Sequence, residues 1–372
     1  GCGSPSVEPR VRSLPVEPLP PHARGAGALP YGACRLITGG FAIARAVTMS
    51  DVARAAGVSS ATVSYVLSGK RPVSAETRRA VEAAIEELGF RLNTVARSLR
   101  TGRSTLIALV VPDIANPFYA QLAHGLQETL RPGGFHVAIC NTGARLADER
   151  AFLDEAVRQR LAGVVITPFR LAPEDFDVLA SASVPVVVSA DLPFGDHDLV
   201  TPAADGAVRA ALEHVAETGR RRIGVIAGPR DAAGGDPRLE RIRAQAPAFG
   251  LRLPDALVVH GEHTRDAGAE GFGRLMRHRN PPEAVLCAND VAAVGALERA
   301  EQLGLRVPQD VALVGHDDIE FASIVRPRLS TIRYPAEEVG RACARLLAER
   351  LEGRSERSTV EIGARYIKRA SV

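Results

Sequence analysis

The stretch MSDVARAAGVSSATVSYVLSGKRPVSAETRRAVEAAIEELGF, residues 49–90, decides the fold of the N-terminal part of this chain. The Thr48 side chain and the aspartate three residues later form a capping box, which predicts a helix from here through Ala56. Gly57 ends this helix, because a sharp turn between two helices needs a positive φ. Ser59 caps a second short helix. Two short helices joined by a glycine turn are typical of a helix-turn-helix, whose second helix enters the major groove of DNA.

The second helix has an apolar face and a polar face. We expect its buried side chains to be Val63, Val66 and Leu67. Short hydroxyl side chains that suit phosphate oxygens lie at Ser59, Thr62, Ser64 and Ser68. A third helix is predicted from Ser74 to Gly89. Its apolar stripe would occur in any small three-helix domain and therefore says nothing about function: Val81, Ala84, Ile85 and Leu88.

This stretch resembles, without a gap, the head of the lactose/galactose-repressor family of bacterial transcriptional regulators. The resemblance implies that three residues contact base edges: Ser60, Ala61 and Tyr65. Tyr65 departs from the family, which usually has an arginine there, and arginine pairs bidentately with guanine. Tyrosine can donate one hydrogen bond or stack against a thymine methyl. The sequence therefore predicts DNA binding and leaves the operator sequence open.

Residues 93–103 form a short amphipathic segment that would otherwise be interpreted as a linker. Their position behind the head resembles the hinge helix of the same family, which folds on operator DNA and pairs with the hinge of a second subunit. The resemblance implies that Leu99 wedges between base steps in the minor groove. The predicted DNA-contacting set is completed by Thr48, Asn93 and Ala96. Two half-sites and a paired hinge imply a dimer.

From residue 104 to residue 372, short apolar runs alternate with helix-like stretches. The runs are LIALVV, HVAIC, GVVIT, VPVVV, RIGVIAG, ALVVH, AVLCA and VALVG. Continuous apolar runs of this length indicate parallel strands that are covered on both faces. We therefore expect an α/β fold. An all-α helix-turn-helix head, residues 47–92, precedes a two-lobed, doubly wound body that resembles periplasmic binding proteins.

Polar and aromatic residues follow several of these runs, and ligands of doubly wound folds bind beyond the carboxyl ends of strands. The predicted effector-binding residues are Asn116, Phe118, Tyr119, Asp191, Arg238, Asn289 and Asp317. Aromatic rings suit the apolar faces of a sugar ring, and carboxylates and a guanidinium suit its hydroxyls. The body also resembles pentose-binding proteins, which implies a pentose-like sugar or a nucleoside. Two departures near the pocket, His263 and Arg241, leave the identity of the effector open.

The overall charge and composition agree with a DNA-binding head on a larger body. Residues 48–103 carry nine Lys and Arg against five Asp and Glu, although the whole chain has a net charge of only +3. A basic head suits a phosphate backbone. The five cysteines are widely scattered, without metal-ligand spacing, which indicates a reducing cytoplasm. Residues 1–46 are aperiodic and begin with a proline-rich stretch, so we predict a disordered extension and a functional protein that begins near residues 47–49.

No nucleophile elbow, phosphate-binding loop or metal-binding motif occurs in the sequence, so we predict no catalytic residue, no metal and no cofactor. We expect a cytoplasmic homodimer, with a tetramer as the alternative, that represses transcription from an operator. A small sugar-like effector would close the lobes and change operator affinity. A sugar-binding transport component is one alternative, and the head argues against it. A sugar-processing enzyme that uses Asp317 and Asp318 as acid and base is the other.

Overall fold

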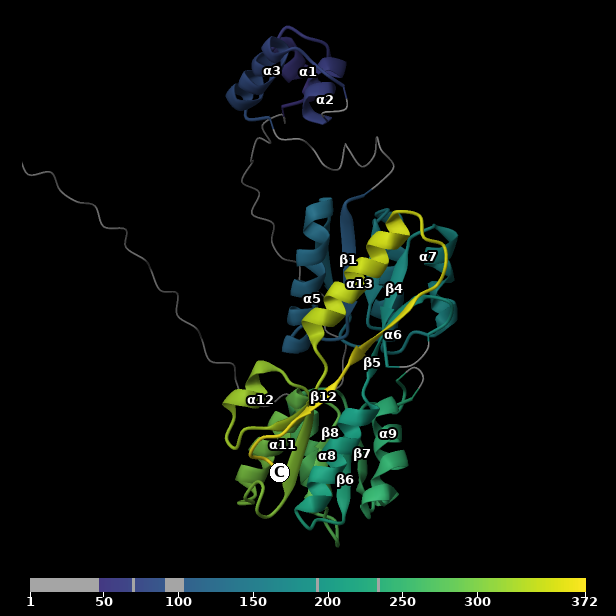
Figure 1. Cartoon of the computed structure of the whole chain (residues 1–372), viewed down its shortest axis with the longest axis vertical. Coiled ribbons are helices and arrows are strands. Elements are labelled where there is room, and N and C mark those ends of the chain that lie inside the picture. Colours follow the sequence, from purple (N-terminus) through teal and green to yellow (C-terminus); the bar gives the residue numbers. More distant parts are fainter. Residues whose placement is uncertain (1–46, 69–70, 91–103, 192–193, 233–234) are drawn as a thin grey trace, which may run out of the picture. The chain divides into compact units, whose positions relative to one another are not determined.

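The computed structural model describes residues 47–68, 71–90, 104–191, 194–232 and 235–372. Asn93, Ala96 and Leu99 therefore lie outside the described residues. The chain divides into two compact units, residues 1–91 and 92–372, and both are drawn in Figure 1. Each unit is described by itself.

The described part of the first unit contains three helices around a small apolar core. Their bounds are α1 Met49–Ala55, α2 Ser60–Ser68 and α3 Ala75–Leu88. The capping box at Thr48 is confirmed: its Oγ1 accepts the N–H of Asp51 at 3.3 Å, and Asp51 Oδ2 accepts the N–H of Thr48 at 3.0 Å. Gly57 has a φ of 63°, as the predicted turn requires. Val63 is fully buried, but Leu67 is 38% exposed. The prediction for Leu67 was wrong because this residue lies in the last turn of α2, past the valines that fill the core.

The second unit contains two α/β lobes (Figure 1). The first lobe has a six-stranded sheet in the order β11-β5-β4-β3-β1-β2. Its strands are β1 Leu106–Val111, β2 His136–Asn141, β3 Gly163–Ile166, β4 Val186–Ser189, β5 Asp198–Ala203 and β11 Thr359–Gly363. One face packs against α5 Pro117–Leu130 and α13 Ala336–Leu351, and the other against α6 Leu146–Arg158 and α7 Asp177–Ser181.

The second lobe repeats this design with the strand order β12-β10-β9-β8-β6-β7. Its strands are β6 Ile223–Ala227, β7 Val258–His260, β8 Ala284–Cys287, β9 Ala312–Asp317, β10 Ser330–Arg333 and β12 Arg365–Ile367. One face packs against α8 Asp205–Glu217 and α9 Pro237–Gln245. The other packs against α10 Arg265–Met276 and α11 Asp290–Gln302, beside the short α12 Glu320–Ile324.

The two sheets are parallel except for the pairing of β10 with β12. All eight apolar runs contribute a strand, so the expected doubly wound α/β class is confirmed. Four strands were missed: β5, β10, β11 and β12. β11 alternates exposed and half-buried residues, and β5 contains Pro202, so neither forms a continuous apolar run. The chain passes between the lobes at residues 203–205, 333–336 and 363–365, which places the carboxyl ends of both sheets at one cleft.

Glycines allow α5 and α13 to pack very closely (Figure 1). A Cβ at Gly125 would lie 2.1 Å from the carbonyl oxygen of Glu337. A Cβ at Gly340 would lie 2.1 Å from the carbonyl oxygen of Leu122. Any side chain at either position would therefore push the two helices apart. This contact fixes α13, which follows one of the crossings between the lobes.

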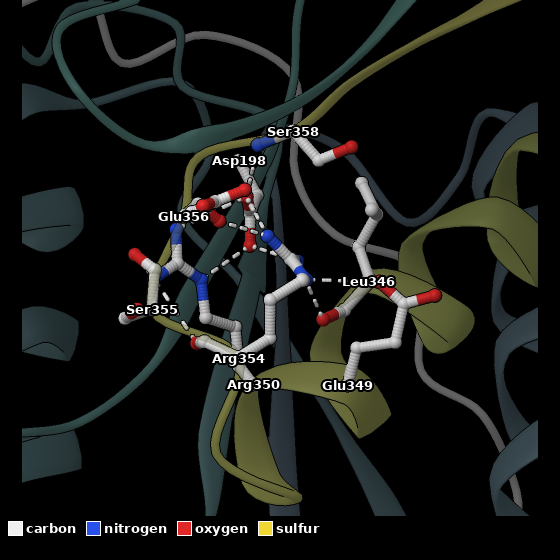
Figure 2. Close-up of polar contacts among 8 residues, drawn as sticks. All are labelled: Asp198, Leu346, Glu349, Arg350, Arg354, Ser355, Glu356 and Ser358. Atoms are coloured by element: carbon white, nitrogen blue, oxygen red, sulfur yellow. Dashed lines mark hydrogen bonds and ion pairs between the residues drawn. The ribbon is translucent and has the colours of Figure 1, made fainter.

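A buried carboxylate joins the end of α13 to β5 (Figure 2). Asp198, the first residue of β5, is fully buried, and each of its oxygens accepts hydrogen bonds from both Arg350 and Arg354 at 2.7–3.1 Å. The N–H of Ser358 adds a bond of 2.8 Å. Burial alone would raise the pKa of Asp198, but these donors outweigh it and lower the pKa. The network holds the chain that leads from α13 into β11.

Candidate functional site

The outer face of α2 presents small side chains to solvent. Ser60 and Ala61 are exposed, as expected for residues that contact base edges. The hydroxyls of Ser59 and Thr62 lie 2.9 Å apart, and Ser59 Oγ also accepts the N–H of Thr62 at 3.1 Å. Ser64 is half-buried. The Ser59 hydroxyl therefore caps the helix, and the Thr62 hydroxyl lies against it.

Tyr65 is half-buried and has a partner that the sequence did not reveal. The guanidinium of Arg71, in the segment before α3, lies over its ring at 5.2 Å from the ring centroid. A cation over an aromatic face is attracted by the negative potential of the ring. The ring thus brings a positive charge to the recognition helix, at the position where an arginine was expected by resemblance.

Asn116 and Asp317 bring the two lobes together across the cleft. Asn116 is the N-cap of α5 in the first lobe, and its Oδ1 accepts the N–H of Phe118 at 3.1 Å. Its Nδ2 lies 3.5 Å from Oδ2 of Asp317, the last residue of β9 in the second lobe. Both residues are buried. Asp317 has a φ of 107°, a conformation that is uncommon for residues other than glycine and that concentrates at functional sites.

Arg238 is the cationic partner of Asp317. Its guanidinium lies 3.6 Å from Asp317 Oδ1 and also donates to the carbonyl oxygen of Ala288, which follows β8. Burial raises the pKa of Asp317 to about 6, although Arg238 and Asn116 act in the opposite direction. At neutral pH the pair therefore presents a carboxylate and a guanidinium side by side, which suits adjacent hydroxyls of one ligand.

Aromatic rings form one wall of this region. The ring of Phe118 stacks on the ring of Tyr334 with a centroid distance of 5.8 Å. The rings of Phe118 and Tyr119 are in an edge-to-face arrangement, with a centroid distance of 5.3 Å. Phe118 is 8% exposed, and Tyr334 is 6% exposed. Most of the surface of Phe118 is therefore used within the protein, and Tyr119 is the more accessible of the predicted pair.

Asp191 forms an ion pair with a residue of the opposite lobe. Arg241 on α9 contacts both of its carboxylate oxygens, at 2.7 and 2.8 Å, and also contacts Asp205 at 3.0 Å. The structure thus places Arg241, a departure noted in the sequence, directly against a predicted effector contact. An effector hydroxyl at Asp191 would have to share the carboxylate with this guanidinium.

Asn289 and His263 are hydrogen-bonded at the carboxyl edge of the second lobe's sheet. Asn289 Oδ1 caps α11 by accepting the N–H of Ala292 at 2.8 Å, and Nδ2 donates to the carbonyl oxygen of His263 at 3.1 Å. Burial, followed by the charge of Arg238, lowers the pKa of His263 to about 4. The imidazole is therefore neutral at pH 7 and can act as a flat, uncharged wall.

Two carboxylates beside the cleft are fully used by the protein. Asp290 accepts the hydroxyl of Thr331 at 2.6 Å and the N–H of Ile319 at 2.9 Å. Asp318 pairs with Arg333 at 2.7 Å and with Arg369 at 2.5 Å. Asp318 thus has a structural role and does not form an acid–base pair with Asp317.

Within the described ranges, no group of three or more His, Cys, Asp or Glu side chains could hold a metal ion. The described helices also include none that is long and apolar enough to cross a membrane. The described residues where the lobes meet offer hydrogen-bonding groups and aromatic surfaces from both lobes.

Comparisons with known proteins cover both units. Residues 48–93 match the family described as bacterial regulatory proteins, lacI family, and residues 212–372 match a periplasmic binding protein-like domain. The chain is 34% identical over 306 residues to the ribose operon repressor of Escherichia coli (strain K12), covering 82% of this chain and 93% of that repressor.

Two solved structures are similar over most of the chain. The transcriptional regulator CelR–cellobiose complex has 32% identity and a TM-score of 0.66, covering 88% of this chain and 100% of the other. The lac repressor dimer bound to operator and the anti-inducer ONPF has 27% identity and a TM-score of 0.78, covering 88% of this chain and 99% of the other.

Proposed function

This chain belongs to the lacI family of bacterial regulatory proteins, and we propose that it represses transcription as a cytoplasmic homodimer whose operator affinity depends on a pentose-like effector. It is a DNA-binding transcriptional regulator with an effector-binding body, as its relatives are. We divide it into a head at 47–92, a hinge at 93–103 and a sensor at 104–372, behind an extension at 1–46.

DNA recognition is assigned to the exposed face of α2. Ser60 and Ala61 project small groups that leave room for base edges, and Tyr65 can donate one hydrogen bond. The guanidinium that lies over the Tyr65 ring supplies a positive charge for phosphate or base contacts. The lac repressor structure contains operator DNA bound by a dimer, which supports the same arrangement for this chain.

The observation that carries the effector assignment is the meeting of Asn116, Arg238 and Asp317 between the lobes. Asn116 caps α5 in the first lobe, whereas Arg238 on α9 and Asp317 on β9 belong to the second, so the Asn116–Asp317 contact exists only when the lobes face each other. A ligand that binds these residues must favour one lobe arrangement, which is the requirement for allosteric coupling. The relatives include a ribose operon repressor and a regulator in complex with cellobiose, which favours a sugar here.

The assignment is tested by a thermal-shift screen of D-ribose, other pentoses and ribonucleosides, because a ligand of the folded state raises the Tm. Arg238→Ala should abolish the shift and the change in operator affinity while leaving operator binding intact. Arg243→Ala is the matched control, because Arg243 lies on the same helix and pairs with Glu240 and Asp255 on the surface. An Arg238→Ala protein that responds at the parental ligand concentration would show that the pocket is misplaced.

A further inference from the structure

The loop that follows β3 is held rigidly by a buried carboxylate. Glu149 on α6 is 1% exposed, and its two oxygens accept the N–H groups of Phe169 at 2.7 Å and Arg170 at 2.9 Å. Because a carboxylate that accepts two backbone N–H groups fixes the position of that backbone, the loop leaves the first lobe in a defined direction. No function was assigned to these residues from the sequence.

The side chain of Arg170 crosses from this loop to the second lobe. Its Nε lies 2.9 Å from Asp231 Oδ2, and its Nη2 lies 3.2 Å from Asp231 Oδ1 and 3.1 Å from Glu262 Oε1. Its Nη1 donates to the carbonyl oxygen of Ala144 in its own lobe. Four hydrogen bonds therefore use most of the donors of the guanidinium, which has five N–H groups.

The neighbouring residue makes a second contact across the cleft. The ring of Phe169 meets His263 of the second lobe edge-on, with a centroid distance of 5.3 Å and an interplanar angle of 77°. The Arg170 guanidinium lies 5.4 Å from the centroid of the Phe169 ring. One short loop thus reaches two segments of the opposite lobe, those that follow β6 and β7.

The exposure of the three charged groups suits a contact that opens and closes. The side chain of Arg170 is 17% exposed, whereas those of Asp231 and Glu262 are 69% and 52% exposed. When the lobes part, the two acids are already largely hydrated, and Arg170 keeps its bond to Ala144. Opening therefore costs the bridging bonds of Arg170 without leaving any of these three charged groups both buried and unpaired. The Arg241–Asp191 contact also crosses between the lobes and breaks on opening, and Arg241 then keeps Asp205 as a partner within its own lobe.

We propose that Arg170 is a latch between the lobes: its bonds to Asp231 and Glu262 stabilise the closed cleft and thereby set the affinity for the effector. Arg170 acts as a positioning residue, since its donors are used by the protein. The inference rests on the proposed function for its effects on effector and operator binding, whereas the opening of the lobes can be measured without any ligand.

The opening can be measured by energy transfer in the full-length, ligand-free protein. Fluorophores attached to azido amino acids at Asp154 on α6 and Glu270 on α10, both exposed, report the distance between the lobes. Arg170→Ala should raise the ratio of open to closed molecules about three- to tenfold, the range for a small ion-pair network. Arg150→Ala is the matched control, because Arg150 pairs with Asp175 within one lobe at 2.7 Å. Equal distance distributions for Arg170→Ala and the parent would overturn the latch.

A double-mutant cycle tests the named partners. The protein with both Asp231→Ala and Glu262→Ala should open to the same extent as Arg170→Ala, and the triple variant should open no further. Raising NaCl from about 0.05 M to about 0.5 M should open the parent more than the triple variant, because salt screens the exposed charges at Arg170, whereas both proteins keep the Arg241–Asp191 pair. Fully additive opening in the triple variant would show that Arg170 acts through other groups.

Operator affinity measured on the same variants separates the latch from the proposed function. A change in the Kd for operator that follows the change in opening supports both. Lobes that open in Arg170→Ala with no change in operator affinity would confirm the latch and contradict allosteric control of DNA binding. Lobes that do not open would overturn the latch alone.

Discussion

Replacing Asp317 with asparagine should make the protein more stable and less responsive. Asp317 is 7% exposed, and burial raises its pKa from 3.8 to about 6. Asparagine has nearly the shape of the protonated acid and tolerates the positive φ at this position better than most residues. The substitution therefore removes a buried negative charge while keeping the backbone of the site.

The size of the stability gain in Asp317→Asn and its pH dependence follow from the shift in the pKa of Asp317. A pKa that is raised in the folded state contributes stability below the unfolded pKa and loses it as the pH rises through the folded pKa. The parent should thus lose stability between pH 4 and pH 6. Each pKa unit corresponds to about 1.4 kcal/mol, so Asp317→Asn should gain about 3 kcal/mol in free energy of unfolding at pH 7–8, about 1 kcal/mol at pH 4.5 and nothing well below the unfolded pKa.

Urea unfolding of parent and variant at pH 4.5 and pH 8 measures this difference. Asp318→Asn is the matched control. The carboxylate of Asp318 pairs with Arg333 and Arg369, so removing its charge should destabilise the protein at pH 8. Asp317→Asn should also bind the effector roughly 10- to 100-fold more weakly, since a charged hydrogen-bond acceptor is lost. A variant that is less stable than the parent at pH 8 would refute the reasoning.

Four further substitutions or truncations test other parts of the molecule. Asp198→Asn should lower the free energy of unfolding by roughly 3–5 kcal/mol, because two guanidinium groups lose a buried partner. Since the pKa of Asp198 is lowered in the folded protein, this loss of stability should shrink as the pH falls through the folded pKa, and a loss that is constant with pH would contradict the ion-pair account. Tyr65→Arg should introduce a guanine preference of roughly 1–3 kcal/mol in operators selected from a random pool at equal salt, and identical selected motifs would remove Tyr65 from the base-contacting set. Leu99→Ala, predicted from resemblance, should reduce DNA bending in a circular-permutation gel assay without changing effector binding; unchanged bending argues against a minor-groove wedge. A chain that begins at Val47 should keep the parental Tm and operator affinity, and a loss of either would show that residues 1–46 contribute.

The head and the sheet were predictable because their causes are local. A capping hydroxyl at Thr48 and a positive φ at Gly57 set the helices of the head within a few residues. Buried parallel strands give continuous apolar runs, and residues that follow such strands meet at one edge. That rule, together with the resemblance to pentose-binding proteins, brought Asn116, Arg238 and Asp317 into one candidate site.

The rest depends on contacts between distant segments. The pairing of Asp191 with Arg241 and the reach of Arg170 to Asp231 exist only after the two lobes have formed and face each other. No local pattern marks them. Asn289 follows a strand, as the rule requires, but its Oδ1 caps α11 and its Nδ2 donates to the carbonyl oxygen of His263. The position of a residue after a strand therefore did not reveal whether its polar atoms are available to a ligand.

The central claim is that the binding of a small-molecule effector changes the affinity of this protein for operator DNA, and that operator binding changes its affinity for the effector. The direct measurement is the Kd for an operator selected from a random pool, at fixed salt, with and without saturating ligand from the pentose and nucleoside screen. The Kd for that ligand is then measured with and without operator. Linkage requires both affinities to change by the same factor, which we expect to lie between about 5 and 150. An operator Kd that stays the same at saturating ligand would contradict allosteric control.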